Sequence, residues 1–327
     1  MDKKPWHRLK ARDVRLERKR SSQGNWKDKE RRKEMSKTCV TYPIVAALKK
    51  AEEFVKPVKN WRGSSFTCDR FLRDFLGRCC REISRIPEIE SIASKSADEI
   101  NKFLADKGFD IQLNPFSSQE FGVASVLDML VEWAEKGEVT SVTRRNTHDK
   151  YPAVRIAGGR YVDFLETNKH NHAIARLRTK SGDFVHITIL DYLPDNSGSF
   201  KLVEIAEELS EGDESDDLIG GVVFPMVSLN QRVDISWLIG LRTTGADGQP
   251  AIITQALQQT KLRMNEEGAR AQSAVAIGVL RGCLPTYDYV IDWPFLFWIT
   301  RPGICKPLFV AYVTEDDWKN PGSIRTK

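Results

Sequence analysis

The residues best suited to a chemical role lie in one stretch near the C-terminal end, from Asn265 to Cys283. It opens with charge at Glu266 and Glu267, and after the pivot Gly268 almost every residue is small. Alternate side chains of an extended strand share one face. The face that could enter a packed sheet would carry Ala269, Ala271, Ser273 and Val275. The opposite face would carry Arg270, Gln272, Ala274 and Ala276. The stretch can therefore be an exposed loop and also become a strand.

The same small-residue pattern also fits a Gly/Ala-rich surface loop between two strands. No nucleophile paired with a base and no phosphate-binding loop is found in the sequence, so we do not expect an enzyme with catalytic residues of its own. His170 and His172 lack further ligands at metal spacing. The six cysteines are too few and too irregular for a disulfide scaffold. We expect no metal and no cofactor.

Charge separates the N-terminal segment from the rest. Of the net +5, residues 1–37 contribute +9, because they hold 15 Lys/Arg against 6 Asp/Glu. The segment also has few apolar residues, and burying them cannot offset the conformational entropy lost when the chain becomes ordered. We therefore predict that residues 1–38 are a basic, disordered tail before a domain at 39–327. The tail could bind nucleic acid or another polyanion, act as a localisation signal, or stay solvated. No secretory or membrane segment is seen, which favours the cytoplasm or nucleus, with non-standard secretion left open.

Hydrophobic periodicity outlines the elements around the stretch. Helices are predicted at 43–56, 68–86, 97–108, 117–136 and 200–209. The helix at 117–136 begins with the capping-box pair Ser117 and Glu120. Strands are predicted at 160–166, 172–179 and 183–190, whereas 138–160 reads as a polar loop.

Two motifs in the C-terminal third resemble a known family. The segment 289–299 contains Asp292, Pro294 and Phe295 and is similar to the C-terminal signature of the serpins. Asn265–Gly268 resembles the hinge of their reactive loop, and Gly268 precedes Pro294 by 26 positions, about the spacing such a loop needs. Further serpin-like segments lie at 222–227, 237–241, 253–265 and 308–313. We therefore identify the chain as similar to the serpin family.

The resemblance implies an α+β fold, in which helices pack on mixed and antiparallel β-sheets and a reactive-centre loop is exposed. It also implies a suicide substrate for a serine or cysteine protease, acting as a monomer without a membrane. The protease would cleave the loop at 266–284, and the cut loop would insert into the large sheet before the acyl-enzyme is hydrolysed. The hinge positions are Glu266, Glu267, Gly268, Ala269, Ala271, Ser273 and Ala274. The scissile bond is placed at Gly282–Cys283 or Arg281–Gly282.

The sequence also departs from the serpin pattern. Ala269 stands where Thr or Ser is usual, and Trp293 stands where a small basic or polar residue is usual. The resemblance is strongest over 219–318, loose over 108–195 and absent over 39–107, so the protein looks shortened. Either residues 40–108 rebuild the large sheet, or that sheet is truncated and cannot take up the loop. The alternatives to an inhibitor are a non-inhibitory binding module and a nucleic-acid-binding protein that uses the tail.

Overall fold

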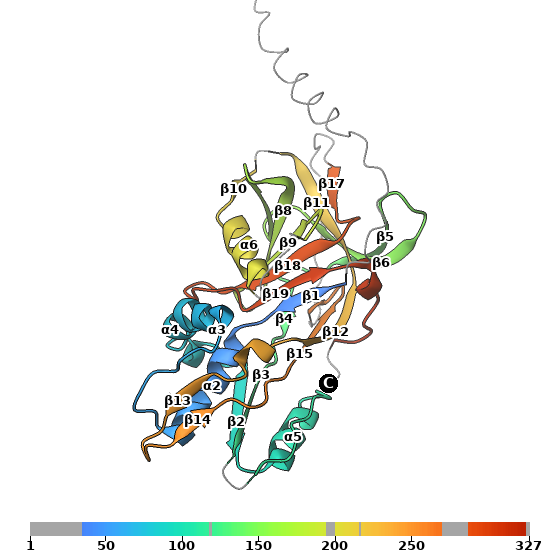
Figure 1. The fold of residues 1–327 in the computed structure, drawn as a ribbon. Helices are drawn as coiled ribbons and strands as arrows, with labels where there is room; N and C mark the ends of the chain where they lie inside the picture. The colour runs from blue at the N-terminus through green and yellow to red at the C-terminus, as the bar shows by residue number, and fades with distance from the viewer. Residues whose placement is uncertain (1–34, 118–119, 194–199, 216, 270–286, 325–327) are drawn as a thin grey trace, which may run out of the picture. The chain divides into compact units, whose positions relative to one another are not determined.

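The computed structural model describes residues 35–117, 120–193, 200–215, 217–269 and 287–324 (Figure 1). The predicted tail lies almost entirely outside the described residues, as do residues 270–283 of the stretch from Asn265 to Cys283. Within the described part, no helix is both long and apolar enough to cross a membrane.

A seven-stranded antiparallel sheet forms the centre of the fold, in the order β1-β19-β18-β9-β8-β7-β10. Its strands are β1 (Lys37–Cys39), β19 (Phe309–Val313), β18 (Phe295–Thr300), β9 (Phe184–Ile189), β8 (His170–Arg178), β7 (Val162–Thr167) and β10 (Asp213–Glu214). Both faces of β18 are buried: Phe297 belongs to one hydrophobic core and Trp298 to the other. This explains the unbroken apolar run of that strand. The strands predicted at 160–190 are confirmed.

A four-stranded sheet packs on the first core, in the order β17-β11-β6-β5. It contains β5 (Glu138–Thr143), β6 (Lys150–Ala157), β11 (Ile219–Pro225) and β17 (Tyr287–Val290), with β17 parallel to β11. The prediction of a polar loop at 138–160 is wrong, because these residues form the β5–β6 hairpin. Strand β5 lies at the sheet edge with only Val142 buried, so its composition is polar although its backbone is fully paired to β6.

The predicted helices are present except for one. They are α2 (Tyr42–Val55), α5 (Ala97–Asp106), α6 (Lys201–Ser210) and a broken segment made of α3 (Phe66–Phe71), the π-helix η1 (Leu72–Leu76), α4 (Gly77–Cys79) and the 3-10 helix η2 (Ile83–Arg85). Pro43 lies in the first turn of α2, and the side chains of Ser65 and Ser96 accept hydrogen bonds from backbone N–H groups at the starts of α3 and α5. Residues of α2, α3, α4 and α6 contribute to the second core.

The helix predicted at 117–136 is wrong. Ser117 and Glu120 do bond to each other, but β3 (Gly122–Leu127) and β4 (Val131–Glu132) follow instead of a helix. Burial alternates along β3, as in a strand with one buried face. The cause is tertiary: β3 pairs over its whole length with β2 (Ile89–Ser94), and this pairing overrides the helical spacing of the apolar residues.

Two further strands complete the region around β3. They are β12 (Val227–Val233) and β15 (Gln258–Met264), which pair antiparallel. The remaining short elements are β13 (Arg242–Thr244), β14 (Pro250–Ile252), β16 (Gly268–Ala269) and the 3-10 turns η3 (Ser236–Leu238) and η4 (Glu315–Asp317). Strand β2 comes from within residues 40–108, and among the described residues it forms a two-stranded sheet with β3.

Candidate functional site

The hinge motif forms a closed turn at the end of β15. The Asn265 N–H donates to the Gly268 carbonyl (3.0 Å), and the Gly268 N–H donates back to the Asn265 carbonyl (3.3 Å). The Asn265 side-chain oxygen also accepts from the Glu267 N–H at 2.9 Å. Asn265 is itself buried, and its amide nitrogen donates to the Gly322 carbonyl (3.1 Å). The chain therefore leaves β15 through a turn that is fixed on several sides.

After the turn, the hinge already pairs as a strand. Gly268 and Ala269 form β16, which pairs antiparallel with β4 through Glu132 and Val131. The Trp133 indole N–H donates to the Asn265 carbonyl at 3.0 Å in a buried contact. The first residues of the reactive stretch therefore occupy a strand position beside β4.

Glycine is required at position 268 for two reasons. Its φ is +124°, in the region that side chains rarely adopt. A Cβ at this position would lie 2.7 Å from the Val131 carbonyl oxygen and 2.8 Å from the Trp133 nitrogen. Sequence reasoning identified Gly268 from the hinge motif, but it missed the partners in β4. The signal that could have found them was the β-branched Val131 within a segment interpreted as helical.

Beyond the hinge, a gap separates β15 from β3. Within the described residues, β15 pairs only with β12 and β16 only with β4, while β3 pairs only with β2. A cavity of about 830 Å³ lies between β3 and β15, and α2 also contributes to its lining. In the part of the chain that the structure describes, each of these two strands therefore has one edge without a ladder partner. Backbone groups on such an edge can pair with an added strand.

The gap has a cover made by the segment 108–114. The Asn114 N–H donates to the Gln255 side-chain oxygen (2.8 Å), and the Gln255 amide donates to the Asn114 carbonyl (3.4 Å). Further along, the Asp110 N–H donates to the Gln259 side-chain oxygen at 2.9 Å. Side chains at the β15 side of the gap thus hold this cover, while Phe109, Ile111 and Leu113 line the cavity.

The residues of the serpin-like C-terminal signature make hydrogen bonds and packing contacts within the fold. Asp292 accepts two hydrogen bonds from the Arg145 guanidinium (2.9 and 3.4 Å), and the Trp293 ring lies 4.9 Å from the Arg144 guanidinium carbon. The Pro294 carbonyl accepts from the Leu190 N–H at 3.0 Å. Phe295 is fully buried at the start of β18. These residues anchor the chain where it returns from the loop to the central sheet.

The segment that follows the predicted loop belongs to the four-stranded sheet. Strand β17 pairs with β11, and Asp288 receives two hydrogen bonds from the Arg155 guanidinium of β6 (2.7 and 3.1 Å). The segments that flank the predicted loop thus pair with β4 on one side and with β11 on the other. The loop's predicted residues Ala271, Ser273, Ala274, Arg281, Gly282 and Cys283 lie outside the described residues. The structure therefore shows the segments on both sides of the predicted loop and leaves the scissile bond a prediction.

Comparison with solved structures places this architecture among the serpins. The chain is similar to serpin SRPN18 of Anopheles gambiae (TM-score 0.57, 10% identity, 88% of this chain and 93% of that one). It is similar to Serpin48 of Tenebrio molitor (TM-score 0.53, 13% identity, 86% and 92%) and to the thermophilic serpin Tengpin in its native state (TM-score 0.54, 10% identity, 89% and 90%). No protein-family model and no curated protein sequence matches the chain.

The chain therefore has a serpin-like α+β fold. A match over at least 86% of the chain necessarily includes part of residues 39–107, where the sequence shows no resemblance. It also spans at least 90% of each of these three serpins, so at the level of the fold little of their length lacks a counterpart.

Proposed function

We propose that the protein is a serpin-like inhibitor of a serine or cysteine protease, with residues 266–284 as the bait. The observation that carries this proposal is the position of the hinge, whose first strand residues pair with β4 at the gap between β3 and β15. A cut loop that continues this ladder would satisfy the open edges of both strands. The free energy of that pairing would drive insertion.

The side chains of the bait support the same proposal. A strand inserted into the gap would place alternate residues against the interior, and these are Ala269, Ala271 and Ser273. A large charged group on that face would be buried without a partner, at a cost that would block insertion. The other face, with Arg270 and Gln272, would tolerate charge.

The proposed bond is Arg281–Gly282 or its neighbour Gly282–Cys283. The serine hydroxyl of a trypsin-like protease would attack the Arg281 carbonyl, release the new N-terminus at Gly282 and leave an ester to the protease. Inhibition requires that the loop insert before water hydrolyses this ester.

Incubation with trypsin tests the proposal. We expect an SDS-stable complex larger than the protein by roughly the mass of the protease, and a higher melting temperature for the cleaved protein. A matched pair of variants separates insertion from recognition: Ser273→Arg places charge on the inserting face, and Gln272→Arg places the same charge on the opposite face. Ser273→Arg should abolish the complex and leave cleavage intact, whereas Gln272→Arg should retain the complex.

A non-inhibitory binding module is the second candidate, and the cover of the gap favours it. The hydrogen bonds from Asn114 to Gln255 and from Asp110 to Gln259 would have to break before a strand could enter along β15. A solved structure of thyroxine-binding globulin in complex with thyroxine is also similar to this chain (TM-score 0.50, 12% identity, 85% of this chain and 92% of that one). Cleavage near Arg281 without a complex and without a rise in melting temperature would support this second function.

A further inference from the structure

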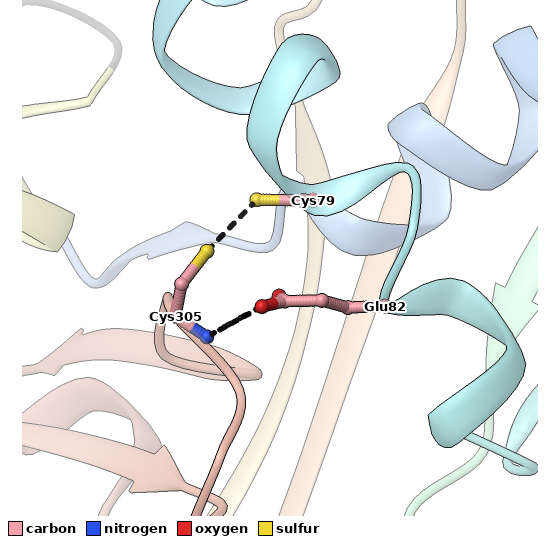
Figure 2. A group of neighbouring side chains, drawn as sticks. All are labelled: Cys79, Glu82 and Cys305. Atoms are coloured by element: carbon pink, nitrogen blue, oxygen red, sulfur yellow. Dashed lines mark hydrogen bonds between the residues drawn. The ribbon is translucent and has the colours of Figure 1, made fainter.

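Two thiols and a carboxylate from distant parts of the chain meet beside the second core (Figure 2). Cys79 ends α4, Glu82 lies in the turn that follows, and Cys305 lies in the connection between β18 and β19. Their ligand atoms all lie within 4.8 Å of one another, and the Cys79 and Cys305 sulfurs are 3.6 Å apart. No motif predicts this group, because Cys305 is 223 residues from Glu82.

The local fold holds each of the three groups in place. The Glu82 N–H donates to the Cys79 carbonyl (3.0 Å), so a single turn puts both side chains on the same side. The Cys305 N–H lies 3.2 Å from both carboxylate oxygens of Glu82, which draws the β18–β19 connection toward the helix. The Arg85 guanidinium also donates to the Gly303 carbonyl at 2.7 Å. The group is therefore organised before any ligand binds.

We propose that Cys79, Glu82 and Cys305 bind a zinc ion, with the fourth position open to water. Thiolate and carboxylate ligands suit this borderline-soft divalent ion, which prefers tetrahedral sites. With Zn–S bonds of about 2.3 Å, two sulfurs of a tetrahedral site lie roughly 3.8 Å apart. The observed 3.6 Å is close to that value.

The surroundings match the needs of such a site. Tyr42, which is fully buried, donates its hydroxyl to Glu82 at 2.6 Å and so orients the carboxylate. Outer hydrogen bonds of this kind fix metal ligands and strengthen binding. Exposure increases from the buried Cys79 through Glu82 to the exposed Cys305, which gives the ion a route from solvent. The ion would link the broken helical segment 66–85 to the connection between two central strands.

A disulfide between the two cysteines fits the geometry less well. The sulfur atoms would have to close from 3.6 Å to about 2.05 Å, and an external oxidant would have to accept two electrons.

Cobalt titration of the reduced, metal-stripped full-length protein tests the site, because Co²⁺ replaces zinc and absorbs light. We expect one equivalent to give thiolate-to-cobalt bands in the near ultraviolet and intense visible bands typical of tetrahedral coordination. One equivalent of Zn²⁺ should remove both sets of bands. Cys305→Ser and Cys79→Ser should lose the thiolate bands, and Glu82→Gln should weaken zinc binding about tenfold or more.

Cys80→Ser is the matched control, because Cys80 is adjacent in sequence and does not belong to the group. It should bind cobalt like the parent protein. Since Cys305 is exposed, Cys305→Ser should keep the metal-free circular dichroism spectrum and melting temperature of the parent, which separates lost ligation from lost folding. Absence of the bands in the parent protein, or their persistence in Cys305→Ser, would overturn the proposal. So would a Cys79–Cys305 disulfide peptide found in aerobically purified protein that binds no zinc after reduction.

Discussion

The central sheet and the gap between β3 and β15 differ in how they use their strand edges. In the central sheet, β18 pairs with β19 on one side and β9 on the other, and both of its faces are buried. Around the gap, β3 and β15 each have one ladder partner among the described residues, and side chains hold a separate segment across the opening. The central sheet would gain few new backbone hydrogen bonds by rearranging. The strands around the gap still have edges whose backbone groups could pair with another strand.

We therefore expect changes in the two regions to affect different properties of the protein. Changes in the central sheet should lower the free energy of unfolding of the whole domain. Changes at the hinge and the cover should mainly alter how readily the gap opens, because local openings cost less than global unfolding.

The largest effect is expected for Trp298→Ala in the centre of the sheet. Trp298 is fully buried, stacks on His186 with ring centroids 4.8 Å apart, and donates to the Ser210 hydroxyl at 2.8 Å. Its removal leaves a large cavity and should lower the free energy of unfolding by about 3–5 kcal/mol. Urea denaturation followed by circular dichroism measures this. A loss below about 1 kcal/mol would show that the central sheet does not dominate the stability of the domain.

The next effect is a pH dependence that belongs to the same sheet. Burial, followed by a smaller contribution from Arg176, lowers the pKa of His186 from 6.5 to about 3. Between these values the unfolded chain binds a proton that the folded chain does not. Stability from this group is therefore present above pH 6.5 and falls as the pH drops toward 3, by about 1.4 kcal/mol per pH unit at its steepest.

The variant His186→Phe tests this assignment, because it keeps a ring to stack on Trp298 and removes the titrating group. The slope of unfolding free energy against pH between about 4 and 6 should become shallower by about one proton. Burial also lowers the pKa of His170, to about 4, so part of the slope should remain. An unchanged slope in the variant would assign the pH dependence to other groups.

At the hinge, Gly268→Ala should weaken the pairing of β16 with β4. The added Cβ meets backbone at 2.7 Å in a residue with φ of +124°, and we expect a cost of about 1–3 kcal/mol. Gly159 is a matched control, because it has a similar φ of +127° and a Cβ added there would meet no atom of the described residues within 4 Å. Urea midpoints of the two alanine variants should differ, with Gly268→Ala the less stable. Equal midpoints would mean that only backbone strain, and not contact with β4, restricts position 268.

The sequence predicts the central sheet better than the gap for a physical reason. Phe184 to Ile189 alternate as a strand requires, and the local pattern and the tertiary pairing of β9 with β18 agree there. In β3 they conflict, because Phe121, Ala124 and Leu127 repeat at helical spacing while the partner strand β2 lies about thirty residues earlier. The hinge was accessible through its motif, but Val131 and Trp133, which hold it, were hidden inside the wrongly predicted helix. The zinc ligands were inaccessible because only the fold brings Cys305 to Cys79.

The smallest expected effect concerns the cover, and it bears most directly on function. Gln255→Ala removes both hydrogen bonds to Asn114, each contributing about 0.5–1.5 kcal/mol. Amide hydrogen exchange at Asn114 should accelerate by roughly two- to tenfold, while global stability changes little. Gln258→Ala is the control, because that side chain donates to the Val40 carbonyl (2.8 Å) instead of to the cover. If the cover opposes loop insertion, Gln255→Ala should also trap a larger fraction of the protease per cleavage than Gln258→Ala does. Faster exchange without more trapping would show that the cover opens independently of the loop, and the binding module would then be the better description of the gap.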